Sequence, residues 1–133
     1  MDQKWLYNWK GKTILVVEDD KFLLSAYKMK LSKENFEVET VLDGEEAILK
    51  LETFIPDIIL LDLIMPKKDG FEVLKIIKSQ DKWKTIPVII TSNLGQKEDI
   101  DHGMAMGAVD YFVKSDLSLE QLLVKINSVL NTQ

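Results

Sequence analysis

The sequence contains no cysteine among its 133 residues and only one histidine, His102. The missing cysteines exclude disulfides and thiolate metal sites, and a single imidazole excludes a metal site built on several histidines. No apolar run comes near the roughly 20 residues that span a bilayer. The first dozen residues also lack the continuous apolar stretch of a secretory signal. We therefore expect a cytoplasmic protein that does not insert into a membrane.

Basic residues are fewer than acidic ones, 17 against 22, which gives a net charge of −5 and a pI near 4.9. This balance disfavours nonspecific binding to nucleic acid or to an anionic membrane. The length suits one domain with its own core, which we place at residues 12–133 behind an N-terminal extension at residues 1–11. Three aromatic residues of the extension either fold back onto the domain or anchor a partner or a dimer: Trp5, Tyr7 and Trp9.

Short apolar runs alternate with segments of helical periodicity along the chain. The runs predict five strands, at Thr13–Val17, Val38–Leu42, Ile58–Leu61, Val88–Thr91 and Tyr111–Val113. Helical patterns lie within residues 22–31, 45–51, 71–77, 96–106 and 119–130, the last with a capping box at Ser118 and Gln121. Because three of the runs are apolar nearly throughout, we expect parallel strands buried on both faces. Five such units predict an α/β fold with a doubly wound, five-stranded parallel sheet.

Polar residues follow four of the five predicted strands. In chain order these are Glu18, Asp19 and Asp20, then Asp62, then Thr91 and Ser92, and finally Lys114. The carboxyl ends of parallel strands meet at one edge of the sheet, where open α/β sheets bind ligands. Oxygen ligands without histidine or cysteine favour Mg²⁺, and a cation would relieve the repulsion among the acids. A carboxylate beside a cation, an ammonium and a hydroxyl is also suited to accept a phosphoryl group.

Four segments in order resemble the receiver domain of response regulators, the phosphoacceptor module of two-component signalling. They are ILVVEDD, PDIILLDLIMPKKDG, IPVIITS and GAVDYFVK, and the resemblance covers residues 12–131. It is similar in extent to the stand-alone, chemotaxis-regulator-like type. The resemblance implies a flavodoxin-like fold with strand order 2-1-3-4-5.

The resemblance also implies the metal and acceptor residues. Asp62 matches the aspartate that is phosphorylated. Glu18 and Asp19 match the acidic pair that holds Mg²⁺, with Asp19 the direct ligand and Glu18 acting through water. The backbone carbonyl of Ile64 matches a further metal ligand. Asp20, by contrast, is expected to cap the following helix.

Other residues match the parts of the family that respond to phosphorylation. Thr91 matches the hydroxyl that bonds the phosphoryl oxygen, and Lys114 the lysine that pairs with the acceptor. Tyr111 matches the aromatic residue whose inward or outward position reports the state. Ile64 and Asn93 occupy the positions that tune the decay of the phosphoryl group.

Two departures from the family pattern stand out. Ser115 follows Lys114 where the family usually has proline, so we expect a trans peptide bond there. Ser92 replaces the alanine that often follows the hydroxyl residue, adds a donor near the site, and is a third candidate for tuning the decay of the phosphoryl group. Asp57 has a similar local context to Asp62, but it precedes the strand and is not expected to be the acceptor.

The resemblance implies a receiver that takes a phosphoryl group from a histidine kinase or a histidine phosphotransfer protein. It would then switch the face made by the helix at 96–106, the strand at 111–113 and the helix at 119–130, for a downstream protein target or a homodimer. Because no output domain follows in the sequence, we expect a stand-alone relay, which is not an enzyme in its own right. The alternative is a receiver-like interaction module that works without phosphorylation.

Two further classes fit the residues less well. A Mg²⁺-dependent phosphohydrolase of similar topology would need a second acid two residues after the nucleophile, where this chain has Ile64. A flavodoxin-like cofactor carrier would need a phosphate-binding loop after the first strand, where this chain has acids.

Overall fold

Five parallel strands form one sheet in the order β2-β1-β3-β4-β5 in the computed structural model, which describes residues 11–65 and 68–131. The strands are β1 (Thr13–Val17), β2 (Glu37–Val41), β3 (Ile58–Asp62), β4 (Val88–Ser92) and β5 (Asp110–Val113). The helices are α2 (Lys21–Lys33), α3 (Gly44–Leu51), α4 (Gly70–Ser79), α5 (Lys97–Ala105) and α6 (Leu119–Asn131). The predicted flavodoxin-like α/β fold and its strand order are confirmed.

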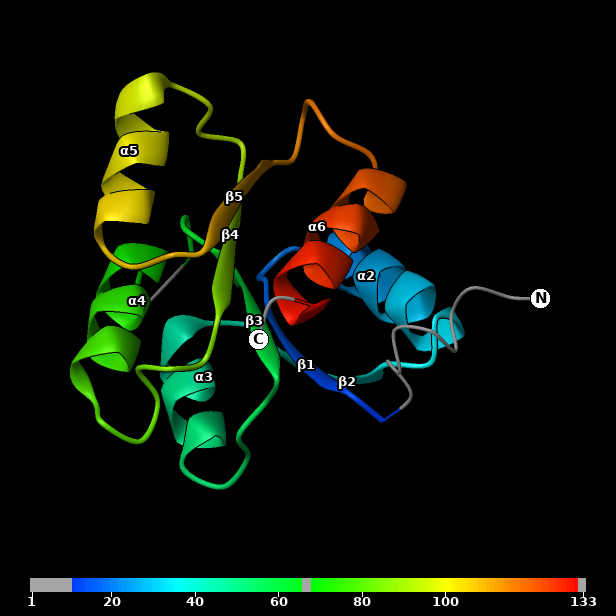
Figure 1. Ribbon diagram of the computed structural model, residues 1–133, viewed down its shortest axis with the longest axis horizontal. Helices are drawn as coiled ribbons and strands as arrows, with labels where there is room; N and C mark the ends of the chain where they lie inside the picture. Colours follow the sequence, from blue (N-terminus) through cyan, green and yellow to red (C-terminus); the bar gives the residue numbers. More distant parts are fainter. Residues whose placement is uncertain (1–10, 66–67, 132–133) are drawn as a thin grey trace.

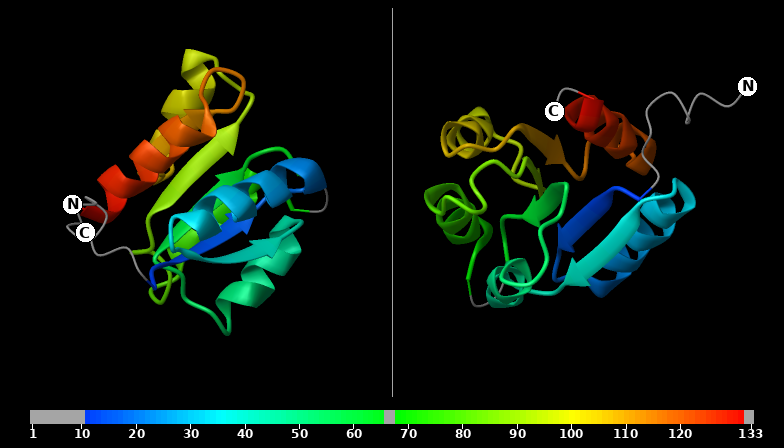
Figure 2. Two further views of the ribbon diagram at one scale, coloured as in Figure 1. Left: turned by 90° about the vertical axis from the view of Figure 1, so that its right-hand side faces the viewer. Right: turned by 60° about the horizontal axis from the view of Figure 1, so that its bottom comes forward.

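Helices cover both faces of the sheet (Figure 1). Side chains of a strand alternate between faces, and β1 shows the result. Leu15 and Val17 belong to a core cluster shared with α3 and α4, whereas Ile14 and Val16 belong to a second cluster shared with α2 and α6. Two turned views show the same layers (Figure 2). Every residue of β3 and β4 is buried, which explains why their sequences are almost wholly apolar.

The predicted strand boundaries are right to within one residue. β1 matches its prediction, while the second strand was predicted one residue too late, at Val38–Leu42. β3 and β4 each run one residue further than predicted, so Asp62 and Ser92 pair in the sheet. Asp62 is the register partner of Thr91, so the ladder between β3 and β4 fixes the backbone position of the candidate acceptor. The fourth predicted helix, 96–106, is shorter by one residue at each end.

Aspartates after strands start three of the helices. Asp20, Asp43 and Asp69 each accept a hydrogen bond from the backbone N–H three residues later, at Leu23, Glu46 and Glu72. These contacts satisfy N–H groups that the first helical turn leaves free.

The predicted capping box of α6 is present. The Ser118 backbone N–H donates to the Gln121 side chain at 2.7 Å, and the Gln121 N–H donates to the Ser118 hydroxyl at 3.2 Å. This reciprocal pair fixes the start of α6 after the loop that carries Lys114. Every peptide bond in the described ranges is trans, including the one between Lys114 and Ser115.

Asp57 has a structural role at the start of β3. Its carboxylate accepts from the Thr13 N–H at 2.7 Å and from the Thr13 hydroxyl at 3.2 Å. The Asp57 N–H in turn donates to the Thr13 hydroxyl oxygen at 3.1 Å. These bonds join the starts of β1 and β3, at the opposite edge of the sheet from Asp62.

Gly70 lies where α4 meets the end of β3. A Cβ atom at this position would stand 2.3 Å from the Asp62 carbonyl oxygen and 2.5 Å from the Leu63 Cα. The Gly70 N–H donates to the Leu63 carbonyl at 2.9 Å. Only glycine allows this approach, so α4 supports the backbone of the candidate acceptor directly.

No helix in the part of the chain that the structure describes is long and apolar enough to cross a bilayer. Trp5, Tyr7 and Trp9, and with them the prediction for the N-terminal extension, lie outside the described residues.

Candidate functional site

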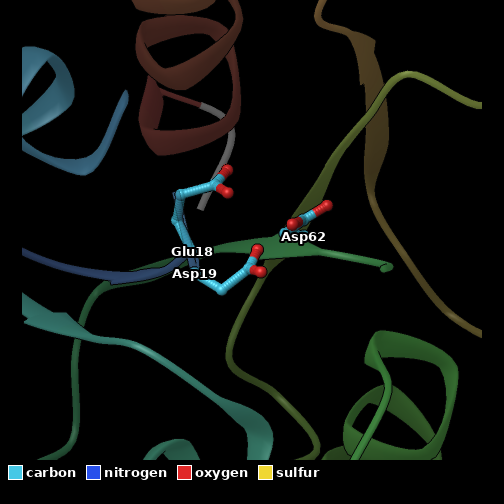
Figure 3. Close-up of side chains that lie close together, drawn as sticks. All are labelled: Glu18, Asp19 and Asp62. Atoms are coloured by element: carbon cyan, nitrogen blue, oxygen red, sulfur yellow. The ribbon is translucent and has the colours of Figure 1, made fainter. Parts of the chain in front are cut away.

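Three carboxylates from two strand ends form the centre of the candidate site (Figure 3). Glu18 and Asp19 follow β1, and Asp62 is the last residue of β3. One oxygen of each lies within 4.8 Å of the others. Glu18 is 1% exposed and Asp62 is 4% exposed, whereas Asp19 faces solvent. Adjacent central strands of a parallel sheet therefore bring together acids that are 44 residues apart.

Lys114, which follows β5, supplies the positive charge. Its ammonium lies 2.5 Å from Glu18 Oε1 and 3.4 Å from Asp62 Oδ1. The sequence predicted the contact with Asp62, and the structure adds the shorter contact with Glu18. Because the Glu18 carboxylate is fully buried, this ion pair offsets part of the cost of removing it from water.

The pKa of Asp62 is raised to about 7, first by burial and then by the negative charge of Glu18. Lys114 acts in the opposite direction, and so does the Ile64 N–H, which donates to Asp62 Oδ1 at 3.4 Å. The site without a cation thus holds more negative charge than its one ammonium can balance.

The same residues fit a hard divalent cation. The donor atoms are all oxygens, and the open cleft around them has a volume of about 370 Å³. Its walls are formed by Glu18, Asp19, Asp20, Asp62, Ile64, Asn93, Leu94 and Lys114. Carboxylates whose negative charge is not fully offset by neighbouring cations favour the binding of Mg²⁺. Among the described residues, this is also the one group of acids close enough to hold a metal ion.

Asp20 caps α2, as predicted, because its carboxylate accepts from the Leu23 N–H at 3.1 Å. The Asp20 N–H donates to Glu18 Oε2 at 3.2 Å. Its side chain lines the cleft but is committed to the helix end. The run of three acids therefore divides into a pair that faces Asp62 and a third that starts a helix.

The predicted hydroxyl residues lie buried at the end of β4. Thr91 is 1% exposed, and it is the register partner of Asp62. Ser92 is also fully buried, and its hydroxyl oxygen accepts from the Leu94 N–H at 3.0 Å. Ser92 thus shapes the loop after β4, a role that the sequence did not predict.

Tyr111 is buried and points toward the same loop. Its hydroxyl donates to the Leu94 carbonyl at 2.6 Å, and burial raises the pKa of its phenol. Leu94 is consequently held from two sides, by Ser92 through its N–H and by Tyr111 through its carbonyl. Sequence reasoning missed Leu94, since only its backbone takes part and no side-chain pattern marks it.

Two of the three predicted tuning positions lie at the mouth of the cleft, and the third, Ser92, is buried. Ile64 is 62% exposed and Asn93 is exposed, and both line the cleft. Ile64 follows the end of β3 by two residues, and Asn93 follows the end of β4 by one. His102 has no place in this site, since it stacks on Phe71 at 4.4 Å between ring centroids.

Curated relatives are similar to this chain over most of its length. The chain is 32% identical over 117 residues to the phosphate regulon transcriptional regulatory protein PhoB of Rhizobium meliloti. It is 34% identical over 120 residues to the alkaline phosphatase synthesis transcriptional regulatory protein PhoP of Bacillus subtilis. These matches cover 88% and 90% of this chain but 51% and 49% of those proteins. The chain therefore spans about half the length of the curated relatives it matches.

Solved structures match over nearly their whole length. The receiver domain of the Francisella response regulator 1452 aligns with a TM-score of 0.84 and 31% identity, covering 92% of this chain and 98% of that chain. The chemotaxis response regulator CheY4 of Vibrio cholerae aligns with a TM-score of 0.84 and 30% identity, covering 90% and 99%. The family model of the response regulator receiver domain matches residues 14–127. With this match added to the fold and the clustered acids, the chain belongs to the response regulator receiver domain family.

Proposed function

We propose that this chain is a phosphoacceptor that receives a phosphoryl group on Asp62 in a Mg²⁺-dependent reaction. The observation that carries the proposal is the position of the Asp62 carboxylate. It is held at the end of β3 beside two further carboxylates and 3.4 Å from the Lys114 ammonium, and it faces an open cleft. An acceptor needs this combination of a fixed nucleophile, positive charge and access.

In the proposed reaction, a carboxylate oxygen of Asp62 attacks the phosphorus of a phosphohistidine. The O–P bond forms as the N–P bond breaks, and the electron pair of that bond stays on the departing imidazole nitrogen. Lys114 is already within reach of the attacking carboxylate and can donate to a phosphoryl oxygen after transfer. Positioning of this kind supplies most of the catalysis in phosphoryl transfer.

The metal would be held by Glu18, Asp19, Asp62 and the Ile64 backbone carbonyl. When bound, Mg²⁺ would offset charge on the phosphoryl oxygens and on the acids around them. Asp19 is the exposed member of the three carboxylates and can contact a cation from the solvent side. Glu18 is engaged by Lys114 and by the Asp20 N–H, which suits contact through water.

Phosphorylation would be signalled through the loop after β4. Thr91 would bond the new phosphoryl group, and its movement would pass to Leu94, which Tyr111 holds through its hydroxyl. The face made by α5, β5 and α6 would then shift between two arrangements. Couplings of this sort are typically about 1–3 kcal/mol.

The lifetime of the signal would depend on water reaching the phosphorus. Ile64 and Asn93 stand at the mouth of the cleft, where they can obstruct or orient that water. An apolar side chain at Ile64 cannot hydrogen-bond a water molecule. We therefore propose that Ile64 slows hydrolysis.

The proposed donor is a histidine kinase or a histidine phosphotransfer protein, which the chain would meet in the cytoplasm. The proposed recipient is a downstream protein or a second copy of the chain, bound through the α5–β5–α6 face. Two curated relatives are named as transcriptional regulatory proteins, and this chain matches about half of each.

The test is phosphorylation by acetyl phosphate with Mg²⁺, followed by intact mass spectrometry. The wild-type chain should gain the mass of one phosphoryl group, and Asp62→Asn should gain none. Asp81→Asn, a solvent-exposed aspartate paired with Lys84, is the matched control and should gain as the wild type does. A wild-type chain that stays unmodified with both acetyl phosphate and a kinase would leave the phosphorylation-independent module as the correct function.

A further inference from the structure

Tyr27 has a polar hydroxyl group that lies in the core of the protein. The residue lies in α2 and is 1% exposed. Its hydroxyl has no hydrogen-bond partner among the residues that the structure describes. Buried polar side-chain atoms are paired in most proteins, so an unpaired phenol in the core requires an explanation. Phenylalanine would fill the same space without it.

The Tyr27 ring packs in the core on one face of the two strands that lead to the carboxylate cluster. Tyr27 shares a core cluster with Val16 and Leu60, which precede Glu18 and Asp62 by two positions and so point to the same face of the sheet. α2 begins next to the site, and helical side chains lean toward the helix N-terminus, which directs the Tyr27 ring toward the acids. Burial raises the pKa of the phenol, and the charge of Glu18 raises it further.

Glu18 is the carboxylate that phosphorylation would leave with fewer partners. Its Oε1 now accepts from Lys114 at 2.5 Å, and its Oε2 accepts from the Asp20 N–H at 3.2 Å. In the proposed function, Lys114 turns to the phosphoryl group on Asp62. Glu18 is fully buried, so it cannot replace a lost ammonium with bulk water.

We propose that the Tyr27 hydroxyl is the reserve donor for Glu18, engaged when Lys114 turns to the phosphoryl group. The phenolic O–H then donates to the Glu18 carboxylate and keeps it in place beside the metal. Tyr27 is thus a positioning residue, which acts through Glu18 and does not touch the phosphoryl group. The inference rests on the proposed function, because it needs Lys114 to move.

The test compares the wild type with Tyr27→Phe in two states. The first state is the free protein, where the variant loses no hydrogen bond and should unfold at the same temperature as the wild type or higher. The second is the complex with Mg²⁺ and beryllofluoride, a phosphoryl mimic. Here the variant should bind beryllofluoride roughly tenfold more weakly, the fold-change of one hydrogen bond to a charged group.

The matched control for the free protein is Tyr111→Phe. The Tyr111 hydroxyl already donates to Leu94, so its loss should lower the unfolding temperature where the loss of the Tyr27 hydroxyl does not. Equal beryllofluoride affinity in the wild type and Tyr27→Phe would overturn the inference, and so would a Tyr27→Phe free protein destabilised as much as the control. Wild type that binds no beryllofluoride would instead overturn the proposed function, and the inference with it.

Discussion

At the scale of single residues, burial and the neighbouring Glu18 carboxylate together raise the pKa of Asp62. Two carboxylates that are both more than nine-tenths buried share one ammonium, and the pKa of Asp62 rises to about 7 as a result. The free protein therefore keeps a carboxylate that is destabilised by its neighbours, and a bound cation would reduce this repulsion. Two predictions follow from this charge balance, one with protons and one with metal.

The proton prediction concerns Asp62→Asn in metal-free buffer. The folded pKa of Asp62, about 7, lies above the ordinary value, near 4. The native state therefore binds more protons than the unfolded state between about pH 4 and pH 7, and this group lowers stability as the pH rises through that window. Asparagine removes the effect, so the variant should melt about 4 °C or more above the wild type at pH 8, and the difference should shrink at pH 5.

The matched control is Asp57→Asn. Its carboxylate accepts two hydrogen bonds from Thr13 and lies at the opposite edge of the sheet from the carboxylate cluster. The substitution should therefore lower the melting temperature at pH 8. If Asp62→Asn also melted below the wild type at pH 8, the carboxylate cluster would be stabilising and not strained.

The metal prediction compares two adjacent aspartates by thermal unfolding with and without about 10 mM Mg²⁺. A cation that binds only the native state stabilises it, here by roughly 1–3 kcal/mol. Asp19→Asn should lose most of this gain, because Asp19 belongs to the cluster of three acids. Asp20→Asn should keep it, because Asp20 caps α2. A full Mg²⁺ shift in Asp19→Asn, measured against NaCl of equal ionic strength, would remove Asp19 from the metal site.

At the scale of elements, the ends of helices and strands decide where the site residues stand. α2 is followed by its C-cap Glu34 and then by Asn35, whose φ of 72° lies in the left-handed region. The Phe36 N–H donates to the Leu31 carbonyl and the Asn35 N–H to the Ser32 carbonyl, which together close the helix in a Schellman motif. This turn sends the chain back into β2, the edge strand beside β1.

Substitutions at Asn35 should follow the cost of a left-handed backbone. Asn35→Ala should lower the free energy of unfolding by about 1 kcal/mol, while Asn35→Gly should leave it unchanged or raise it slightly. Urea unfolding measures both, and Lys33→Ala, at an exposed helical position two residues earlier, should have little effect. Equal stability of the alanine and glycine variants would show that the backbone does not need the left-handed conformation.

Gly70→Ala tests the contact between α4 and β3. The added Cβ would overlap the Asp62 carbonyl oxygen, so the backbone must move, at a cost of about 1–3 kcal/mol. Acetyl phosphate labelling should slow as well, because that backbone carries the acceptor. Gly95→Ala is the control, since its Cβ would meet only the Val113 side chain at 3.3 Å. Full stability and labelling rate in Gly70→Ala would show that α4 does not fix Asp62.

Local patterns were enough to predict the elements, because buried parallel strands and amphipathic helices leave periodic traces in the sequence. They placed all five strands to within one residue, and strand ends then gave the acids and Lys114. Contacts between distant segments left no such trace. The pairing of Asp57 with Thr13, the hold of Tyr111 on the Leu94 carbonyl and the unpaired Tyr27 hydroxyl each depend on three-dimensional packing. Nothing in the local sequence separates them from ordinary surface or core residues.

At the scale of the whole molecule, the two halves of the structure have different links to Asp62. On one face of the sheet, α2 and α6 share a core cluster with the strands that lead to Glu18 and Asp62. β5 is linked to the site through the loop after β4, where Tyr111 and Ser92 bind the backbone of Leu94. α3 packs on the sheet and on α4. A signal from Asp62 should therefore spread unevenly through the protein.

Amide hydrogen exchange with and without Mg²⁺ and beryllofluoride should show this unevenness. Protection should change by about 5- to 150-fold in Leu94, α5 and β5, the range expected for a coupling of about 1–3 kcal/mol, and it should change little in α3. Asp62→Asn should show no change anywhere. In Tyr111→Phe, the amides next to Asp62 should still respond, but the response of α5 should shrink because its loop has lost the bond to Leu94. An equal response in all helices would mean that the phosphoryl mimic stabilises the fold as a whole and does not act through this loop.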